Sequence, residues 1–202
     1  NASTVGALDL GFYSISNGEN FTFFEKLKNK EFKLIYLLGS DNFDFKKNDE
    51  FIVYQGSHGD RGAEIADLIL PSPAFTEQNG LFLNLEGRLQ ECRKASYPIN
   101  DVKEDWKIFE MIILKNEQKK QFKNFNDLRD QAIQNLKNTS NIGELPNFTE
   151  FTKDNTNSTF LDEHVKIRDI DYYFSNSISR SSKTMSQCRD VRVKNLKEGT
   201  NN

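Results

Sequence analysis

The sequence predicts an α/β fold in which short strands pair in parallel. Residues 51–70 give a strand, a glycine-spaced loop, a short helical turn and a second strand, the order of a small α/β unit. Residues 21–38 give a helix and then another strand, and residues 101–114 give an amphipathic helix that should pack on the sheet. Such units bury their strands in parallel sheets, so these three observations together indicate the fold class.

The first part of the chain is expected to contain short elements only. In chain order they are the end of a helix over Asn1–Gly11, a helix over Phe21–Asn29, a buried strand over Phe32–Leu38, a strand over Phe51–Tyr54, a helical turn over Ala63–Ala66 and a strand over Asp67–Leu70. Gly11 is read as a helix stop, and Pro71 ends the last strand.

The second part is expected to begin with a β-hairpin and to end in helices. Asn79-Gly80 lies between candidate strands of Phe75–Gln90, where Leu81, Leu83 and Leu85 alternate with other residues, and Glu86-Gly87-Arg88 closes the turn. Further expectations follow in order: a helix capped by Asn100 or Asp101, a helix over Asp127–Asn138 capped by Asn126, a polar surface segment over residues 139–163, an extended piece over Val165–Phe174 and a helix over Ser177–Lys197. This divides the chain at residues 138 and 163.

Composition excludes several classes of protein. The chain has 202 residues, an apolar share of 36%, 17 Phe and a formal net charge of −3, which gives no electrostatic reason to expect nucleic acid as partner. Its two cysteines, Cys92 and Cys188, are too few for an iron–sulfur or zinc site. No apolar run reaches the roughly 18 residues of a membrane span. No basic-then-apolar leader is visible after Asn1, so we expect either that a leader has been removed or that the sequence is an internal or processed piece. Asn-x-Ser/Thr sequons, such as those at Asn20, Asn138, Asn147 and Asn157, are expected from an Asn-rich chain by chance.

The loop with Gly56, Gly59 and Gly62 is the one place that resembles a phosphate cradle, because glycines after a strand let backbone N–H groups approach an anion. The spacing does not match a dinucleotide motif, so a glycine-permitted tight turn is the default and nucleotide binding the alternative. His58, with Asp60 and Glu64 nearby, could act as a general base, but no nucleophile joins it and a loop histidine is favoured.

Two other residues carry a weaker chemical signal. Cys92 lies between Glu91 and Arg93-Lys94, whose charges could activate the thiol, although no partner motif accompanies it. His164 stands in a polar segment without a partner motif. No catalytic, cofactor-binding or metal-binding residue is therefore assigned.

Several motifs, in one order, resemble a known family. These are ALDLG (7–11), LLGSD (37–41), YQGSHGD (54–60), ADLILP (66–71), NLEGR (84–88), EDWKI (104–108) and SISRSSKTMSQC (177–188). They are similar to the C-terminal portion of the large iron–sulfur subunits of mitochondrial respiratory complex I. ADLILP alone is shared with molybdopterin oxidoreductases generally, whereas the glycine loop together with the C-terminal tail points to complex I.

The resemblance implies the C-terminal portion of a molybdopterin-oxidoreductase-like α/β domain, a mostly parallel sheet flanked by helices and completed by a companion chain. It implies a structural part of the matrix arm at the mitochondrial inner membrane, which supports electron transfer from NADH to ubiquinone and has other matrix-arm subunits as partners. The iron–sulfur clusters are expected on the companion chain and no cofactor on this one. The abrupt helical start at Asn1 is consistent with a subunit split between two chains.

A split subunit needs apolar joints. The faces around Val5, Leu8, Leu34–Leu38 and Ile178–Met185 are therefore expected to be interchain contacts. Two alternatives stay open. One is part of an active molybdopterin-dependent oxidoreductase of the formate-dehydrogenase type, with the Gly56–Gly62 loop at the cofactor. The other is a free-standing nucleotide-binding module.

Overall fold

The computed structural model describes residues 4–12, 23–40, 45–117, 119–136, 141–146 and 171–197. The chain divides into two compact units, Asn1–Asn147 and Phe148–Asn202. The expected boundaries at residues 138 and 163 and most of the polar segment between them lie outside the described residues.

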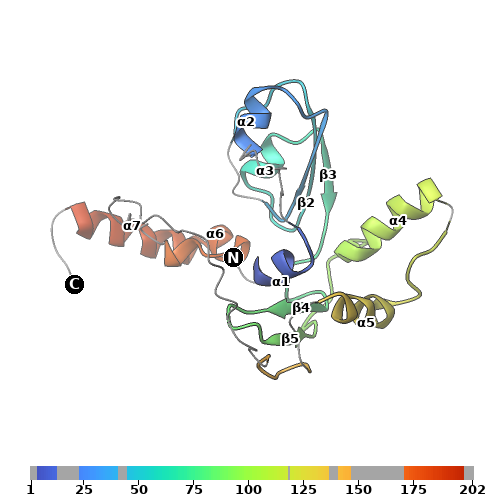
Figure 1. Cartoon of the computed structure of the whole chain (residues 1–202). Coiled ribbons are helices and arrows are strands. Elements are labelled where there is room, and N and C mark those ends of the chain that lie inside the picture. Colours follow the sequence, from blue (N-terminus) through green and yellow to red (C-terminus); the bar gives the residue numbers. More distant parts are fainter. Residues whose placement is uncertain are drawn as a thin grey trace, which may run out of the picture. The chain divides into compact units, whose positions relative to one another are not determined.

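The first unit contains a parallel sheet of three strands (Figure 1). The strands are β1 (Leu34–Leu38), β2 (Phe51–Gly56) and β3 (Leu68–Pro71), in the order β1-β2-β3. Ile35 pairs with Ile52, and Val53 pairs with Leu68, both in parallel register. The predicted parallel α/β arrangement is confirmed.

One face of the sheet is covered by α2 (Phe23–Lys28) and α3 (Arg61–Glu64). Alternate strand residues point to the same face, so a single core forms from Leu27, Ile35, Leu37, Ile52 and Tyr54. Phe23, Phe32 and Phe45 pack around this core, which shows how the many phenylalanines supply apolar area. The helical turn expected at residues 63–66 begins two residues earlier, because Asp60 caps it by accepting a hydrogen bond from the Arg61 amide.

The opposite face contacts α4 (Asp105–Glu117). The rings of Tyr36 on β1 and Phe109 on α4 lie 5.3 Å apart, so the expected packing of this helix on the sheet is confirmed. The predicted cap at Asn100 or Asp101 is wrong. Asn100 has φ 54°, outside the helical region, and the helix begins at Asp105, whose amide donates to the Gln78 side chain at 3.3 Å.

An antiparallel hairpin joins β4 (Gly80–Leu83) and β5 (Leu89–Cys92), and α1 (Thr4–Asp9) lies against β4. The turn is at Asn84–Arg88, as Glu86-Gly87-Arg88 predicted, whereas Gly80 lies inside a strand and not at a turn. The Asn84 carboxamide accepts from the amides of Glu86 and Arg88, and Gly87 takes φ 78°. The expected leucine alternation fails at Leu85, which is 91% exposed in this turn.

Helix α5 (Phe125–Asn135) is capped by Asn124 and not by Asn126, because the Asn124 carboxamide accepts from the Asp127 amide at 3.1 Å. The connection before it is held to α4 by Glu110. This buried carboxylate accepts a hydrogen bond from the Phe122 amide at 2.8 Å.

The second unit contains η1 (Tyr172–Phe174), α6 (Ser177–Ser181) and α7 (Lys183–Lys197). The extended piece expected up to Phe174 is wrong over Tyr172–Phe174, which form the 3-10 helix η1. The single helix expected over Ser177–Lys197 is broken at Ser182, where ψ is 120°. The Ser182 hydroxyl accepts from the Met185 amide at 3.4 Å and so begins α7. Arg189 pairs with Asp171 and lies 4.6 Å above the Phe174 ring, which joins α7 to η1.

Candidate functional site

The glycine loop at the carboxyl end of β2 is built around the ring of Tyr54. A Cβ on Gly56 would lie 2.2 Å from the Tyr54 hydroxyl oxygen. A Cβ on Gly62 would lie 2.7 Å from the Ser40 carbonyl oxygen and 3.0 Å from the Tyr54 ring. The glycines are therefore required for close packing of the loop on a buried aromatic side chain.

An anionic cofactor does not fit this loop. The Tyr54 hydroxyl donates to the Gly59 carbonyl oxygen at 3.1 Å, so the ring already occupies the space that a cradle would leave open. Helix α3 has four residues and offers too short a dipole to bind an anion. Within the described part of the chain, every buried side-chain polar atom has a hydrogen-bond partner, so none points unpaired into a ligand site.

The structure does not assemble the residues that suggested a general base. His58 is exposed, and its Nδ1 lies 2.8 Å from the Ser57 hydroxyl. Asp60, at φ 75°, uses its carboxylate to accept from the Arg61 amide, and Glu64 is exposed. His164 lies outside the described residues.

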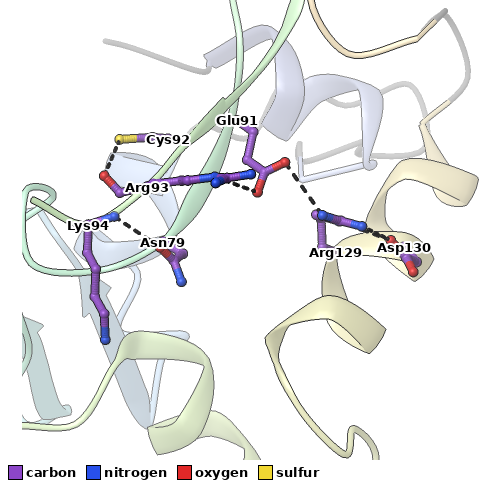
Figure 2. Close-up of polar contacts among 7 residues, drawn as sticks. All are labelled: Asn79, Glu91, Cys92, Arg93, Lys94, Arg129 and Asp130. Atoms are coloured by element: carbon purple, nitrogen blue, oxygen red, sulfur yellow. Dashed lines mark hydrogen bonds and ion pairs between the residues drawn. The ribbon is translucent and has the colours of Figure 1, made fainter.

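Cys92 lies in β5, and its two basic neighbours turn away from the thiol (Figure 2). The Cys92 Sγ contacts the Arg93 carbonyl oxygen at 3.9 Å, whereas the Arg93 guanidinium extends to Glu91. The Lys94 ammonium lies 3.9 Å from a Glu104 oxygen and above the Tyr97 ring. The charges that could have activated the thiol are thus engaged elsewhere.

Glu91, the acidic neighbour of Cys92, forms an ion pair that joins two elements of the fold. Its carboxylate lies 3.5 Å from the Arg129 guanidinium, which also binds Asp130, so β5 is tied to α5 (Figure 2). The Lys94 amide donates to the Asn79 carboxamide at 3.0 Å, which fixes the strand end beside β4.

A buried polar network that the sequence reading missed lies at the carboxyl end of the sheet. The fully buried Gln55 accepts a hydrogen bond from the Tyr36 hydroxyl and donates to Asp105 Oδ1 at 2.7 Å. Gln78 donates to Asp105 Oδ2 at 2.7 Å. Burial, and then the nearby Asp105 carboxylate, raise the pKa of the Tyr36 hydroxyl above its ordinary value.

This network holds α4 against the sheet and leaves no group directed at a substrate. Both carboxylate oxygens and the backbone amide of Asp105 form hydrogen bonds. The amide and one carboxylate oxygen bind Gln78, and the other oxygen binds Gln55. The signal for it was a glutamine inside the otherwise apolar strand FIVYQG, since a buried polar side chain requires partners.

Asp67, in the ADLILP motif, joins β2 to β3. Its amide donates to the Ile52 carbonyl oxygen and its carboxylate accepts from the Ile52 amide, both at 2.8 Å. The hydrogen bond from Lys47, followed by that from Ile52, lowers the pKa of the Asp67 carboxyl. The motif therefore has a structural use in this chain.

Parallel strands, helices on both faces and a glycine turn at the carboxyl end define an α/β domain of the kind that holds cofactors, here with its interior closed by its own side chains. The chain belongs to the molybdopterin oxidoreductase family, whose model matches residues 1–115. A second model, the C-terminal domain of the G subunit of NADH-ubiquinone oxidoreductase, matches residues 149–188. The resemblance stated from the motifs is confirmed.

The relatives are subunits of one kind of enzyme. The chain is 33% identical over 195 residues to the NADH-ubiquinone oxidoreductase 75 kDa subunit of Reclinomonas americana, covering 94% of this chain and 28% of that one. It is 36% identical over 199 residues to the mitochondrial 78 kDa subunit of Candida albicans, covering 93% and 26%. It is 37% identical over 196 residues to the G subunit of NADH-quinone oxidoreductase from Rickettsia prowazekii, also covering 93% and 26%. The chain thus spans little more than a quarter of the length of these relatives.

Proposed function

We propose that this chain is a scaffold segment of the large iron–sulfur subunit of respiratory complex I, in the matrix arm at the mitochondrial inner membrane, and that it carries no redox centre. The observation that carries the proposal is the match to both family models, over residues 1–115 and 149–188, together with relatives that align with 93–94% of the chain. The chain would support electron transfer from NADH to ubiquinone, because its relatives are named as subunits of NADH-ubiquinone oxidoreductase.

The side chains support a role without electron transfer by this chain. An iron–sulfur cluster takes four cysteine ligands, and the whole sequence has two cysteines. The buried network of Gln55 and Asp105 is of the kind that fixes a scaffold, since its buried polar atoms have hydrogen-bond partners within this chain.

Exposed apolar side chains on the outer strands indicate where the rest of the subunit packs. Leu34 and Leu38 on β1 are 57% and 50% exposed, and Leu68 and Ile69 on β3 are 44% and 50% exposed. Strands of parallel sheets are normally buried on both faces, so these positions fit contacts with further parts of the domain. We place those parts on a companion chain that also holds the iron–sulfur clusters.

The predicted interchain faces need one correction. Ile35 and Leu37 lie in the core of this chain, because they point to the face covered by α2, and only the other residues of Leu34–Leu38 are directed elsewhere. Leu8 is half exposed, and Val5, Ile178 and Met185 are partly buried. Contacts of these residues with a companion chain stay a prediction.

Purification through a tag on this chain tests the proposal. We expect co-purification with complex I subunits and co-migration with NADH dehydrogenase activity on native gels, without stoichiometric molybdenum by elemental analysis. Bound molybdenum would favour the formate-dehydrogenase type of enzyme. A single polypeptide on denaturing gels, containing both this sequence and cluster-binding cysteines, would refute the companion chain.

Expression of the chain alone gives a second test. We expect poorly folded protein, because the apolar strand faces then lack the protein surface that covers them. A stable monomer that melts cooperatively would contradict the joint with a companion chain.

In the described part of the chain, no helix has both the length and the apolar character that crossing a membrane requires. We propose that the chain is attached to the membrane arm through other subunits.

A further inference from the structure

The outer edge of β1 has backbone groups that are directed away from its partner strand. The Lys33 carbonyl oxygen accepts from an amide of β2 at 2.9 Å, and the Gly39 amide donates to a carbonyl oxygen of β2 at 2.8 Å. The N–H and C=O groups of a paired residue point to the same side of its strand, and successive residues alternate. The backbone groups of Leu34, Tyr36 and Leu38 therefore point to the side of β1 on which the described residues place no strand.

The sequence of β1 is that of an internal strand. It reads LIYLL, without a charged residue, a proline or a glycine. Natural edge strands are protected by charges, prolines or bulges, whereas internal strands of parallel sheets are near-continuous apolar runs. Leu34 and Leu38 are nevertheless 57% and 50% exposed. Backbone direction and composition thus independently indicate that a further strand covers this edge.

The connections of the sheet indicate which strand belongs there. Leu27 of α2 and Ala63 of α3 pack on the same core as Ile35 and Ile52, so both helices cover one face of the sheet. Crossovers between parallel strands are right-handed in about 98% of cases. Two right-handed crossovers with their helices on one face therefore advance in the same direction across the sheet. The crossover from β2 through α3 to β3 advances away from β1, so a parallel strand that α2 connects to β1 lies on the free side of β1.

We propose that a strand of the companion chain pairs in parallel with the free edge of β1, so that the sheet continues from one chain into the other. Upstream of α2, the described residues 4–12 contain helix α1 and no strand, so the strand is supplied from elsewhere. The chain covers only 28% and 26% of the length of two relatives, which leaves most of such a subunit to the companion chain. This inference rests on the proposed function, which supplies the companion chain.

A strand fits this edge better than a helix does. The N–H and C=O groups of a helix are paired with one another, so a helix would leave the outward groups of Leu34, Tyr36 and Leu38 without backbone partners. An added strand supplies those partners and also places its own side chains beside Leu34 and Leu38, which lie on one face of β1. Strand addition therefore accounts for both the backbone and the side chains of this edge.

Photo-crosslinking in the purified complex tests the pairing. A diazirine amino acid placed at Leu34 or at Leu38 should link to the companion chain, and the same group at Leu85, which is 91% exposed in the hairpin turn, serves as the control. Leu34 and Leu38 lie about 13 Å apart along β1. In a parallel strand, the residue linked from Leu38 should therefore lie about four residues after the one linked from Leu34.

Other occupants of the edge give different links. A helix along β1 would separate the two linked residues by about nine positions, and an antiparallel strand would reverse their order. Either pattern, or links only to this chain or to a second copy of it, would overturn the inference. If the chain is absent from the complex, the proposed function itself fails, so the two failures are distinguishable.

Hydrogen exchange resolved to single amides tests the hydrogen bonds themselves. In the complex, the Tyr36 amide, which points away from β2, should exchange within about tenfold of the Leu37 amide, which points to β2. A Tyr36 amide that exchanges faster than that would overturn the inference, because it would show an edge open to water.

A substitution at the edge gives a matched comparison. We expect Leu34→Lys to lower retention of the chain in the complex about tenfold, because a lysine opposes pairing at a strand edge. Leu85→Lys, at an exposed leucine outside the sheet, should change retention little. Retention of Leu34→Lys at the wild-type level would overturn the inference.

Discussion

Asp105→Ala is the most informative single substitution for the fold, because it removes the acceptor shared by Gln55 and Gln78. Gln55 is fully buried, so its amide would lose its partner and gain no water, whereas Gln78 is partly exposed and can be hydrated. An unsatisfied buried donor costs about 1–3 kcal/mol, and hydrogen bonds to a charged group are each worth about 1.5–3 kcal/mol. We expect α4 to be held to the sheet less strongly by about 2–4 kcal/mol.

Hydrogen exchange measured by mass spectrometry on the purified assembly checks this value. Local opening free energies set the exchange of protected amides, and about 1.4 kcal/mol corresponds to a tenfold change. Asp105→Ala should therefore speed exchange in the first turns of α4 and at the end of β2 by about 30-fold to 1,000-fold. Amides of α7 serve as the internal reference.

Asp105→Asn is the matched control. The new amide can donate to Gln55 if the Gln55 carboxamide flips, and the Tyr36 hydroxyl can then accept instead of donate. Gln78 keeps both of its bonds. We expect Asn to restore most of the protection, so the reasoning is refuted if Asn is as damaging as Ala, or if Ala leaves exchange unchanged.

Three further predictions concern the sheet. The pKa of Tyr36 is raised, so the stability that its hydroxyl contributes is present below about pH 10 and is lost as the pH rises through the pKa of the folded state. The absorbance difference between wild type and Tyr36→Phe should therefore show a tyrosine that ionises above its ordinary pKa. Ionisation at the ordinary pKa would contradict this prediction. Gly62→Ala places a methyl group 2.7 Å from the Ser40 carbonyl oxygen and should weaken protection of β2 by about 1–3 kcal/mol in the same exchange assay, whereas wild-type protection would show that the loop can shift. The pKa of Asp67 is lowered, so the stability that its carboxylate contributes is present above the pKa of the unfolded state and is lost as the pH falls through the pKa of the folded state. Lys47→Met should move the NMR titration of Asp67 to higher pH. An unmoved titration would exclude the contact between Lys47 and Asp67.

The parallel sheet could be predicted from sequence because its signals are local. A run of β-branched and aromatic residues ending in glycine marks β2, and the helix–strand order marks β1. Helix starts were placed less well. Asn100 and Asn126 are good capping residues by type, but Asn100 takes a left-handed conformation, and Asn124 caps the helix instead of Asn126.

The buried network could not be predicted, because its members are far apart in the chain. Gln55 and Asp105 are separated by 50 residues, and no spacing rule relates them. The break at Ser182 was missed for a different reason. Serine is tolerated inside helices as well as at caps, so the run from residue 177 to residue 197 shows no clear stop in its sequence.

Among the described strands, β3 is at the edge of the sheet, and its residues Leu68, Ile69 and Leu70 are all apolar. An uncovered apolar edge is a template on which any other extended chain can form hydrogen bonds. The proposed function therefore predicts that copies made in excess of the companion chain self-associate as their concentration rises, and that the synthesis of the two chains has to be matched.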